Sequence, residues 1–102
     1  MKSTKRQFST ETLQRVAHLL KTIAHPVKLE ILELLEAEAP LDVSSILARM
    51  DLDCEASMMS HHLRQLRDNG VVRHEKRGKH VYYSIAEPQL LKIFDCMERC
   101  SF

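Results

Sequence analysis

The sequence predicts a mainly helical α+β domain, in which four helices are followed by a β-hairpin and a fifth helix, in the order α-α-α-α-β-β-α. Apolar residues recur every three or four positions over residues 9–68 and again over 88–100, which is helical spacing. Between these stretches they alternate with polar residues, as in a strand. With 102 residues, two glycines and three prolines, the chain has the length of one domain and lacks linker-rich segments. We therefore expect a single domain over residues 1–102.

Composition excludes several classes of protein. Apolar residues make up 44% and charged residues 28% of the chain, an ordinary globular balance. No apolar run reaches the roughly 20 residues that span a bilayer, and the basic residues 1–7 are not followed by the apolar stretch of a signal peptide. We expect a cytoplasmic protein without membrane contact, whose three cysteines are reduced.

The first two helices meet at a proline. Residues 1–8 are expected to be disordered, and Ser9 or Thr10 caps a helix that continues to about residue 24. His25-Pro26 breaks this helix, and Pro26 suits the first position of the second one. Pro40 ends the second helix. Its inner face is formed by apolar residues at Val27, Ile31, Leu34 and Leu35, widened by Leu29 and Leu32.

Two shorter helices follow. Asp42 caps the third helix, with Leu41 before it as a hydrophobic staple. A polar turn over residues 51–54 leads to a fourth helix from about Glu55 to Asp68, which ends at Asn69-Gly70. The residues predicted to face inward are Val43, Ile46, Leu47 and Met50 in the third helix and Met59, Leu63 and Leu66 in the fourth.

After Gly70 the pattern changes to that of a hairpin. One strand begins at Val71-Val72 and a second covers residues 80–85. The basic segment 75–79 between them is predicted to be the turn, with Gly78 at its tip. A fifth helix then starts at Glu87-Pro88, and its apolar stripe consists of Leu90, Leu91, Phe94 and Met97.

The net charge of +1 hides an uneven distribution. Residues 30–55 contain eight acids and one base, Arg49, whereas residues 61–80 contain six bases, two acids and four histidines. Such a split indicates an edge that binds a polyanion. A solvated helix face beside a charged hairpin tip fits the same charges equally well.

The third and fourth helices, joined by a tight turn, form a helix-turn-helix, and the hairpin forms a wing beside it. The major groove of B-DNA, about 12 Å wide, admits one α-helix. Near the start of the fourth helix, the residues available to base edges are Ser57, Met58, Ser60 and His61. Arg64 and Arg67 are expected to reach phosphates. Lys76, Arg77 and Lys79 in the wing would lie along the flanking backbone or enter the minor groove.

Three segments resemble the ArsR/SmtB family of winged helix-turn-helix repressors: residues 57–72, residues 20–32 and residues 77–85. The resemblance covers roughly residues 15–98. It implies a winged helix-turn-helix fold, a dimer joined by the helices near 9–24 and 88–100, and binding to an operator that an inducer weakens. The family's base-facing positions fall on Ala56, Ser57, Met58, Ser60 and His61, where Ala56 and Met58 replace more polar residues.

The chain itself also favours a homodimer. Its first and fifth helices carry more apolar surface than a core of this size covers. A two-fold dimer would place two reading helices about 34 Å apart on double-stranded DNA and so prefer a palindromic operator.

The signal that such a repressor senses is less well defined. The family's Cys-Val-Cys metal motif falls on residues 41–45, which contain no cysteine, and its other site falls on Glu87, Gln89 and Cys100, of which glutamine is a poor zinc ligand. No cofactor is required. Cys96 and Cys100, four apart on one helix face, suggest a thiophilic metal or metalloid inducer or a reversible disulfide, with Cys54 as a third candidate. Simple packing of these thiols is the alternative.

Other readings stay open at this point. His61 and His62 either face DNA or pack inward, and His18 is a candidate to face a dimer partner. A winged helix that docks a protein, or a constitutive regulator without small-molecule sensing, has the same pattern. An enzyme is not expected, because no phosphate-binding loop or nucleophile–base spacing is present. A thiol peroxidase would need a cysteine of strongly lowered pKa, which nothing in the sequence predicts.

Overall fold

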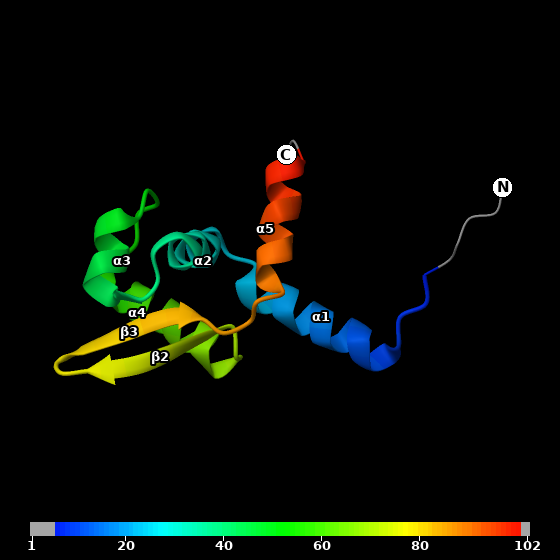
Figure 1. Cartoon of the computed structure of the whole chain (residues 1–102), viewed down its shortest axis with the longest axis horizontal. Helices are drawn as coiled ribbons and strands as arrows, with labels where there is room; N and C mark the ends of the chain where they lie inside the picture. Colours follow the sequence, from blue (N-terminus) through cyan, green and yellow to red (C-terminus); the bar gives the residue numbers. More distant parts are fainter. Residues whose placement is uncertain (1–5, 101–102) are drawn as a thin grey trace.

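A computed structural model describes residues 6–100 of the chain (Figure 1). Its elements are α1 (Thr10–Ile23), α2 (Pro26–Glu38), β1 (Leu41–Asp42), α3 (Val43–Arg49), α4 (Ala56–Asp68), β2 (Val72–Arg77), β3 (His80–Ile85) and α5 (Leu90–Arg99). The predicted fold class and element order are confirmed, with β1 as an addition. Residues 6–8, expected to be disordered, have no regular structure and are exposed; residues 1–5 of that prediction lie outside the described residues.

The sheet has the order β1-β3-β2, and both pairs are antiparallel. β1 pairs Leu41 with Tyr83, and Leu41 is buried in the same core cluster as Ile46 of α3. Two residues are too few to show alternation, and β1 exists only because β3 lies beside it. The hairpin strands extend to Arg77 and His80, so the turn is shorter than the predicted 75–79. Gly78 lies in this turn with φ of +61°, a conformation that favours glycine.

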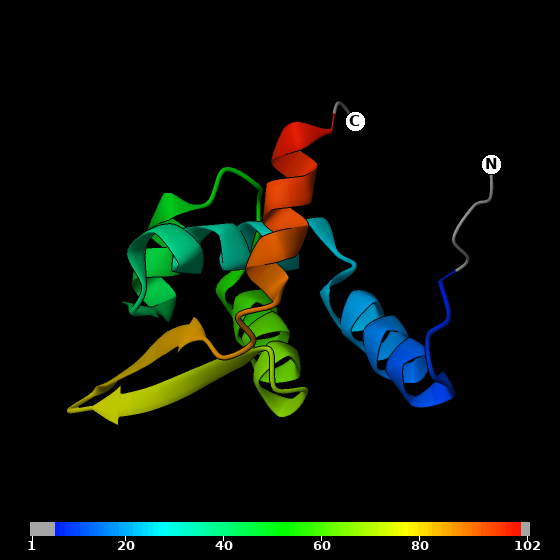
Figure 2. The same cartoon turned by 45° about the vertical axis from the view of Figure 1, so that its right-hand side comes forward.

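The core lies where α2, α3 and α4 meet the base of the hairpin and the start of α5 (Figure 2). Its fully buried side chains are Ile31, Leu32, Leu35, Ile46, Met59, Leu63, Leu66, Val71, Val72 and Leu90. The inward faces predicted for α3 and α4 are confirmed at Ile46, Met59, Leu63 and Leu66. In α2 the inner face is confirmed at Val27, Ile31 and Leu35, whereas Leu34 is half-buried and Leu32, predicted only to widen the face, is fully buried.

Helix ends follow the capping chemistry that the sequence predicts. The Ser9 Oγ accepts a hydrogen bond from the Thr12 N–H at 3.0 Å, and the Asp42 Oδ1 accepts one from the Ser45 N–H at 2.9 Å. Gly70 ends α4 with φ of +75°. The fifth helix begins at Leu90 rather than at Glu87-Pro88, because residues 88–89 form a turn before it.

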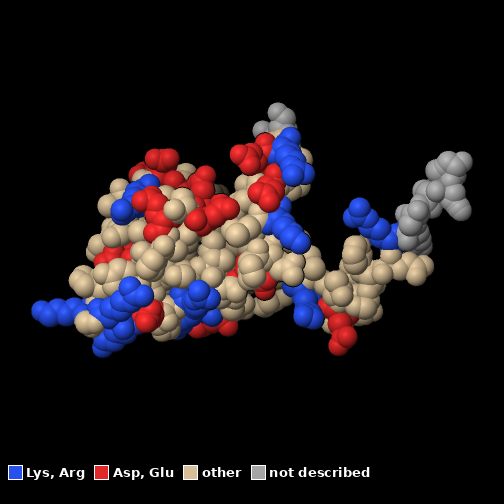
Figure 3. Space-filling model, viewed as in Figure 1, with Lys and Arg blue, Asp and Glu red and all other residues tan. Residues whose placement is uncertain are grey.

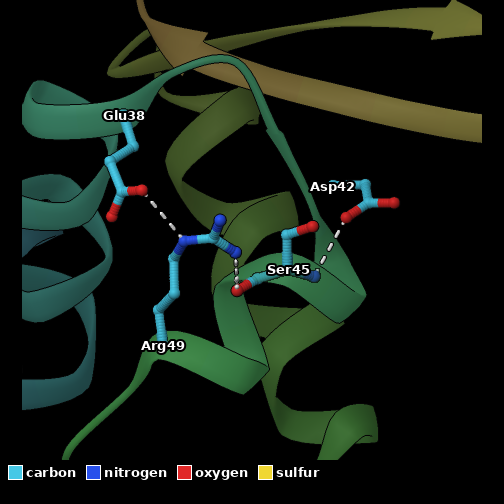
Figure 4. A network of polar contacts seen from close by, with 4 residues as sticks. All are labelled: Glu38, Asp42, Ser45 and Arg49. Atoms are coloured by element: carbon cyan, nitrogen blue, oxygen red, sulfur yellow. Dashed lines mark hydrogen bonds and ion pairs between the residues drawn. The ribbon is translucent and has the colours of Figure 1, made fainter.

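A polar network joins α2, α3 and β1 at the end of the fold that carries the wing (Figure 4). The Arg49 guanidinium donates to the Glu38 carboxylate at 3.1 Å and to the Ser45 carbonyl at 3.0 Å. Asp42 caps the same helix through the Ser45 N–H and also pairs with His80 Nδ1 at 3.2 Å. The network therefore runs from α2 through α3 to the start of β3.

The N-terminal part of α1 extends away from the rest of the chain (Figures 1 and 2), whereas its C-terminal end is anchored by the buried Ile23. Its apolar residues Leu13, Val16 and Leu20 are 55%, 47% and 47% exposed, and Met97 on α5 is 39% exposed. These two helices are the ones that the sequence predicts to bind a second copy. Across residues 6–100, every helix is too short or too polar to traverse a lipid bilayer.

Candidate nucleic-acid interface

Helix α4 has one buried and one exposed face. Met59, His62, Leu63 and Leu66 are at most 5% exposed. The six residues predicted near its start and outer surface are all exposed: Ala56, Ser57, Met58, Ser60, His61 and Arg64. Since the buried residues fix the rotation of α4 about its axis, the fold presents hydroxyl and imidazole groups together on one side of a helix. Such groups can donate to and accept from base edges.

The two predicted phosphate contacts on α4 differ in their surroundings. Arg64 is exposed, and no ion pair among residues 6–100 involves it. Arg67 is half-buried and pairs with Asp68 at 3.1 Å. A surface pair of neighbouring residues is weak, so the Arg67 guanidinium remains able to exchange this partner for a phosphate.

His62 packs inward, which decides one question that the sequence left open. Its side chain is 5% exposed, and its ring centroid lies 4.5 Å from that of His25. Burial lowers the pKa of His62, and the nearby positive charges of His25, Lys28 and His61 add to the shift. His62 is therefore a neutral packing residue on the inner face of α4, and its Nδ1 has no hydrogen-bond partner among the described residues.

The turn between α3 and α4 is held by a residue that sequence reasoning missed. The Glu30 carboxylate on α2 accepts hydrogen bonds from the backbone N–H groups of Asp51 at 2.8 Å and Leu52 at 2.9 Å. In the sequence Glu30 was only one member of an acidic stretch. Its partners are more than 20 positions away, and no local pattern signals the contact.

The wing carries the predicted basic residues at its tip. Lys76, Arg77 and Lys79 are all exposed. Arg77 donates to Glu75 at 2.9 Å, and its guanidinium carbon lies 5.5 Å from the centre of the Tyr82 ring. Neither lysine belongs to an ion pair among residues 6–100. In Figure 3, Lys and Arg gather along the hairpin at the lower left, Asp and Glu gather at the upper left, and α5 carries both signs of charge.

Two of the cysteines are exposed and lie away from this surface, and the third is half-buried in the turn before α4. Cys96 and Cys100 are exposed on α5 and at its end, with their Sγ atoms 3.9 Å apart. The contact with the Cys96 side chain raises the pKa of Cys100. Cys54 is half-buried against the core, and burial, with the neighbouring Glu55 charge, raises the pKa of its thiol. No group of three or more metal-ligating side chains occurs within residues 6–100.

The sequence matches a family of helix-turn-helix domains and several transcriptional regulators. A helix-turn-helix domain family matches residues 23–75, which run from the end of α1 to the first half of β2. The HTH-type transcriptional regulator Rv0081 of Mycobacterium tuberculosis is 39% identical over 76% of this chain and 66% of its own length. The transcriptional repressor PagR of Bacillus anthracis is 35% identical over 78% and 77%. A transcriptional repressor SmtB homolog of Synechocystis is 30% identical over 85% and 64%.

The chain belongs to the ArsR/SmtB family of winged helix-turn-helix regulators. This confirms the family resemblance found in the sequence. The match spans just under two thirds of the mycobacterial relative.

Solved structures agree with this ArsR/SmtB assignment. The crystal structure of Rv0081 superposes with a TM-score of 0.74 at 33% identity, covering 89% of each chain. The crystal structure of PagR gives 0.73 at 33% identity, covering 87% of this chain and 99% of PagR. The homodimeric winged helix-turn-helix DNA-binding domain of Mb0332 from Mycobacterium bovis gives 0.71 at 26% identity, covering 86% and 79%. The ArsR/SmtB-family chain thus shares the winged helix-turn-helix fold over 86–89% of its length.

Proposed function

We propose that this chain is a DNA-binding transcriptional repressor that docks α4 in the major groove of a specific operator. The observation that carries the proposal is the exposed face of α4, on which Ser57, Ser60 and His61 stand together while the opposite face is buried. The wing lysines supply salt-dependent affinity for the backbone. Such a protein would work in the cytoplasm, where its DNA is.

The repressor acts as a homodimer on a palindromic site. Two observations support this part of the proposal. The apolar residues Leu13, Val16 and Leu20 of α1 need a partner surface, and a structural neighbour, Mb0332, is named homodimeric. Two-fold symmetry would turn the two α4 helices toward half-sites about 34 Å apart.

The proposed inducer acts on the thiol pair of α5. The 3.9 Å between the Sγ atoms of Cys96 and Cys100 suits a thiophilic metalloid, or oxidation by a peroxide. In the oxidation, both thiols lose their protons, one S–S bond forms, and the two electrons reduce the peroxide to water. Cys54, which is half-buried and lies outside this pair, is a weaker candidate for this chemistry.

The DNA-binding proposal is tested by selecting bound sequences from a random duplex pool and measuring affinity for the enriched site. We expect a palindrome bound at least about a thousandfold more tightly than random duplex. Equal and weak binding to all duplexes would favour the alternative function, a winged-helix module that docks a protein.

The sensing proposal has its own test. A Cys96→Ser/Cys100→Ser variant should bind the enriched site normally but keep it bound in the presence of arsenite or hydrogen peroxide, whereas Cys54→Ser should still be released. If neither compound releases the unaltered protein, the proposed sensing by the thiol pair is wrong, and the alternative of a constitutive regulator is favoured.

A further inference from the structure

A groove with an apolar floor and an acidic rim runs between α2 and α5, on the side of the molecule away from the wing. Its first part is a cavity of about 380 Å³ lined by Glu33, Glu36, Phe94, Asp95, Met97 and Glu98. A second cavity of about 300 Å³ shares Glu33, Phe94 and Met97 with the first and extends the groove to Leu29 and Leu52. We call the two together the α2–α5 groove.

The floor of this groove is apolar, whereas its rim is negatively charged. Met97 and Leu52 are 39% and 42% exposed, and Phe94 is half-buried, so an apolar surface faces water. Four exposed carboxylates surround it, from Glu33, Glu36, Asp95 and Glu98. None of the ion pairs among residues 6–100 includes them. Grouped carboxylates attract a cationic partner, and the floor favours one that also carries an apolar side chain.

We propose that the α2–α5 groove of one protomer binds the N-terminal segment, residues 1–8, of the other protomer in the dimer. This segment contains Lys2, Lys5 and Arg6, no acid, and the aromatic Phe8. Phe8 is 57% exposed. The positive charges of the segment are therefore complementary to the acidic rim of the groove, and the aromatic ring of Phe8 suits its apolar floor.

The placement of α1 assigns the segment to the partner. The described residues 6–8 do not line their own groove, and the N-terminal end of α1 points away from α2 in both views (Figures 1 and 2). Because α1 exposes its apolar face, it is the helix proposed to lie against the second copy, and the segment that precedes it then reaches that copy. The inference rests on the dimer of the proposed function.

A charge swap in the full chain tests the pairing. Lys5→Glu/Arg6→Glu and Glu33→Lys/Glu36→Lys should each weaken the dimer at least about tenfold at low salt, measured by sedimentation velocity. The protein that carries all four changes should recover most of that loss. The differences should shrink at about 0.5 M salt, where exposed charges are screened.

A matched control alters charge outside the groove. Glu55→Lys/Asp68→Lys, on and beside α4, makes the same change in net charge as the groove variant and should leave dimerisation unchanged. Failure of the fourfold swap to recover the dimer, with both double variants folded by circular dichroism, would overturn the pairing.

A photo-crosslinker placed at position 5 identifies the occupant directly. A covalent dimer whose crosslinked peptides contain residues of α2 or α5 supports the proposal. Crosslinks confined to a single chain, or to other surfaces of the partner, overturn it. Operator binding by the unaltered protein, measured in parallel, shows separately whether the proposed repressor function holds.

Discussion

The carboxylate of Glu30 accepts a hydrogen bond from the backbone N–H of Leu52 at 2.9 Å, which ties the middle of α2 to the turn before the reading helix. Its other oxygen accepts from the N–H of Asp51 at 2.8 Å. Both carboxylate oxygens are thus used on consecutive amides of the helix-turn-helix. We infer that Glu30 positions the start of α4, although it lies far from the surface that reads DNA.

The first prediction follows from this contact. Glu30→Ala should lower the free energy of unfolding by about 1–2 kcal/mol, because two backbone donors lose a charged acceptor. The amides of Asp51 and Leu52 should exchange with deuterium faster, and operator affinity should fall. Glu33→Ala, one turn further along α2, is the matched control and should leave both amides protected. Unchanged amide exchange in Glu30→Ala would show that the turn between α3 and α4 keeps its structure without the Glu30 carboxylate.

Asp42 is predicted to stabilise α3 through its charge and its cap. Hydrogen bonds from Ser45 are the main cause that lowers the pKa of Asp42, and the His80 charge adds to it. A carboxyl whose pKa is lowered in the fold stabilises it above its ordinary pKa, and this stability is lost as the pH falls through the lowered value. The effect should therefore disappear at strongly acidic pH.

Two variants at this position separate the cap from the charge. Asp42→Ala should lower Tm by about 5 °C at pH 7, because the helix loses its cap. Asp42→Asn keeps an acceptor for the Ser45 N–H and should lose less, with a gap to the unaltered protein that closes as the pH falls through the lowered pKa of Asp42. Thermal unfolding followed by circular dichroism measures both, and an equal loss in the two variants would contradict the role of the cap.

The buried His62 predicts a loss of stability in mild acid. Its pKa is lowered in the fold, so below its ordinary value, about 6.5, the unfolded chain binds a proton that the folded chain does not. The free energy of unfolding should fall as the pH drops from about 7 toward 5. Urea titrations of His62→Gln should show a flatter dependence on pH, whatever its absolute stability. His74→Gln, a change at an exposed histidine in β2, should keep the slope of the unaltered protein.

The exposed face of α4 predicts two kinds of effect on DNA binding. His61→Ala should change the preference at one operator position by about 1–3 kcal/mol, because an imidazole that reads a base is lost. Arg64→Ala should weaken binding to all sequences alike and reduce the slope of log K against log salt by about 0.9. Fluorescence anisotropy over single-base operator variants and several salt concentrations distinguishes them. A uniform loss in His61→Ala would place His61 on the backbone instead.

Local patterns were enough for most of the fold. The caps at Ser9 and Asp42, and the end of α4 at Gly70, depend on residues within a few positions of each other, and the sequence showed them. The exposed reading face followed from the period of Met59, Leu63 and Leu66. By contrast, β1 has two residues and depends on its pairing with Tyr83, and Pro88 begins a turn rather than a helix. The strand β1 and the turn at Pro88 both depend on the parts of the fold that pack beside them.

The same distinction between local and long-range contacts applies to the candidate site. The sequence by itself determined the helix-turn-helix, the wing and the exposed residues of α4, because helical and strand periods fix which side chains share a face. Only the tertiary structure decided that His62 packs on His25, that Glu30 holds the turn before α4, and that α2 and α5 enclose an acidic groove. Those relations join residues distant in the chain, and their geometry is set by how the helices pack on one core rather than by any local preference.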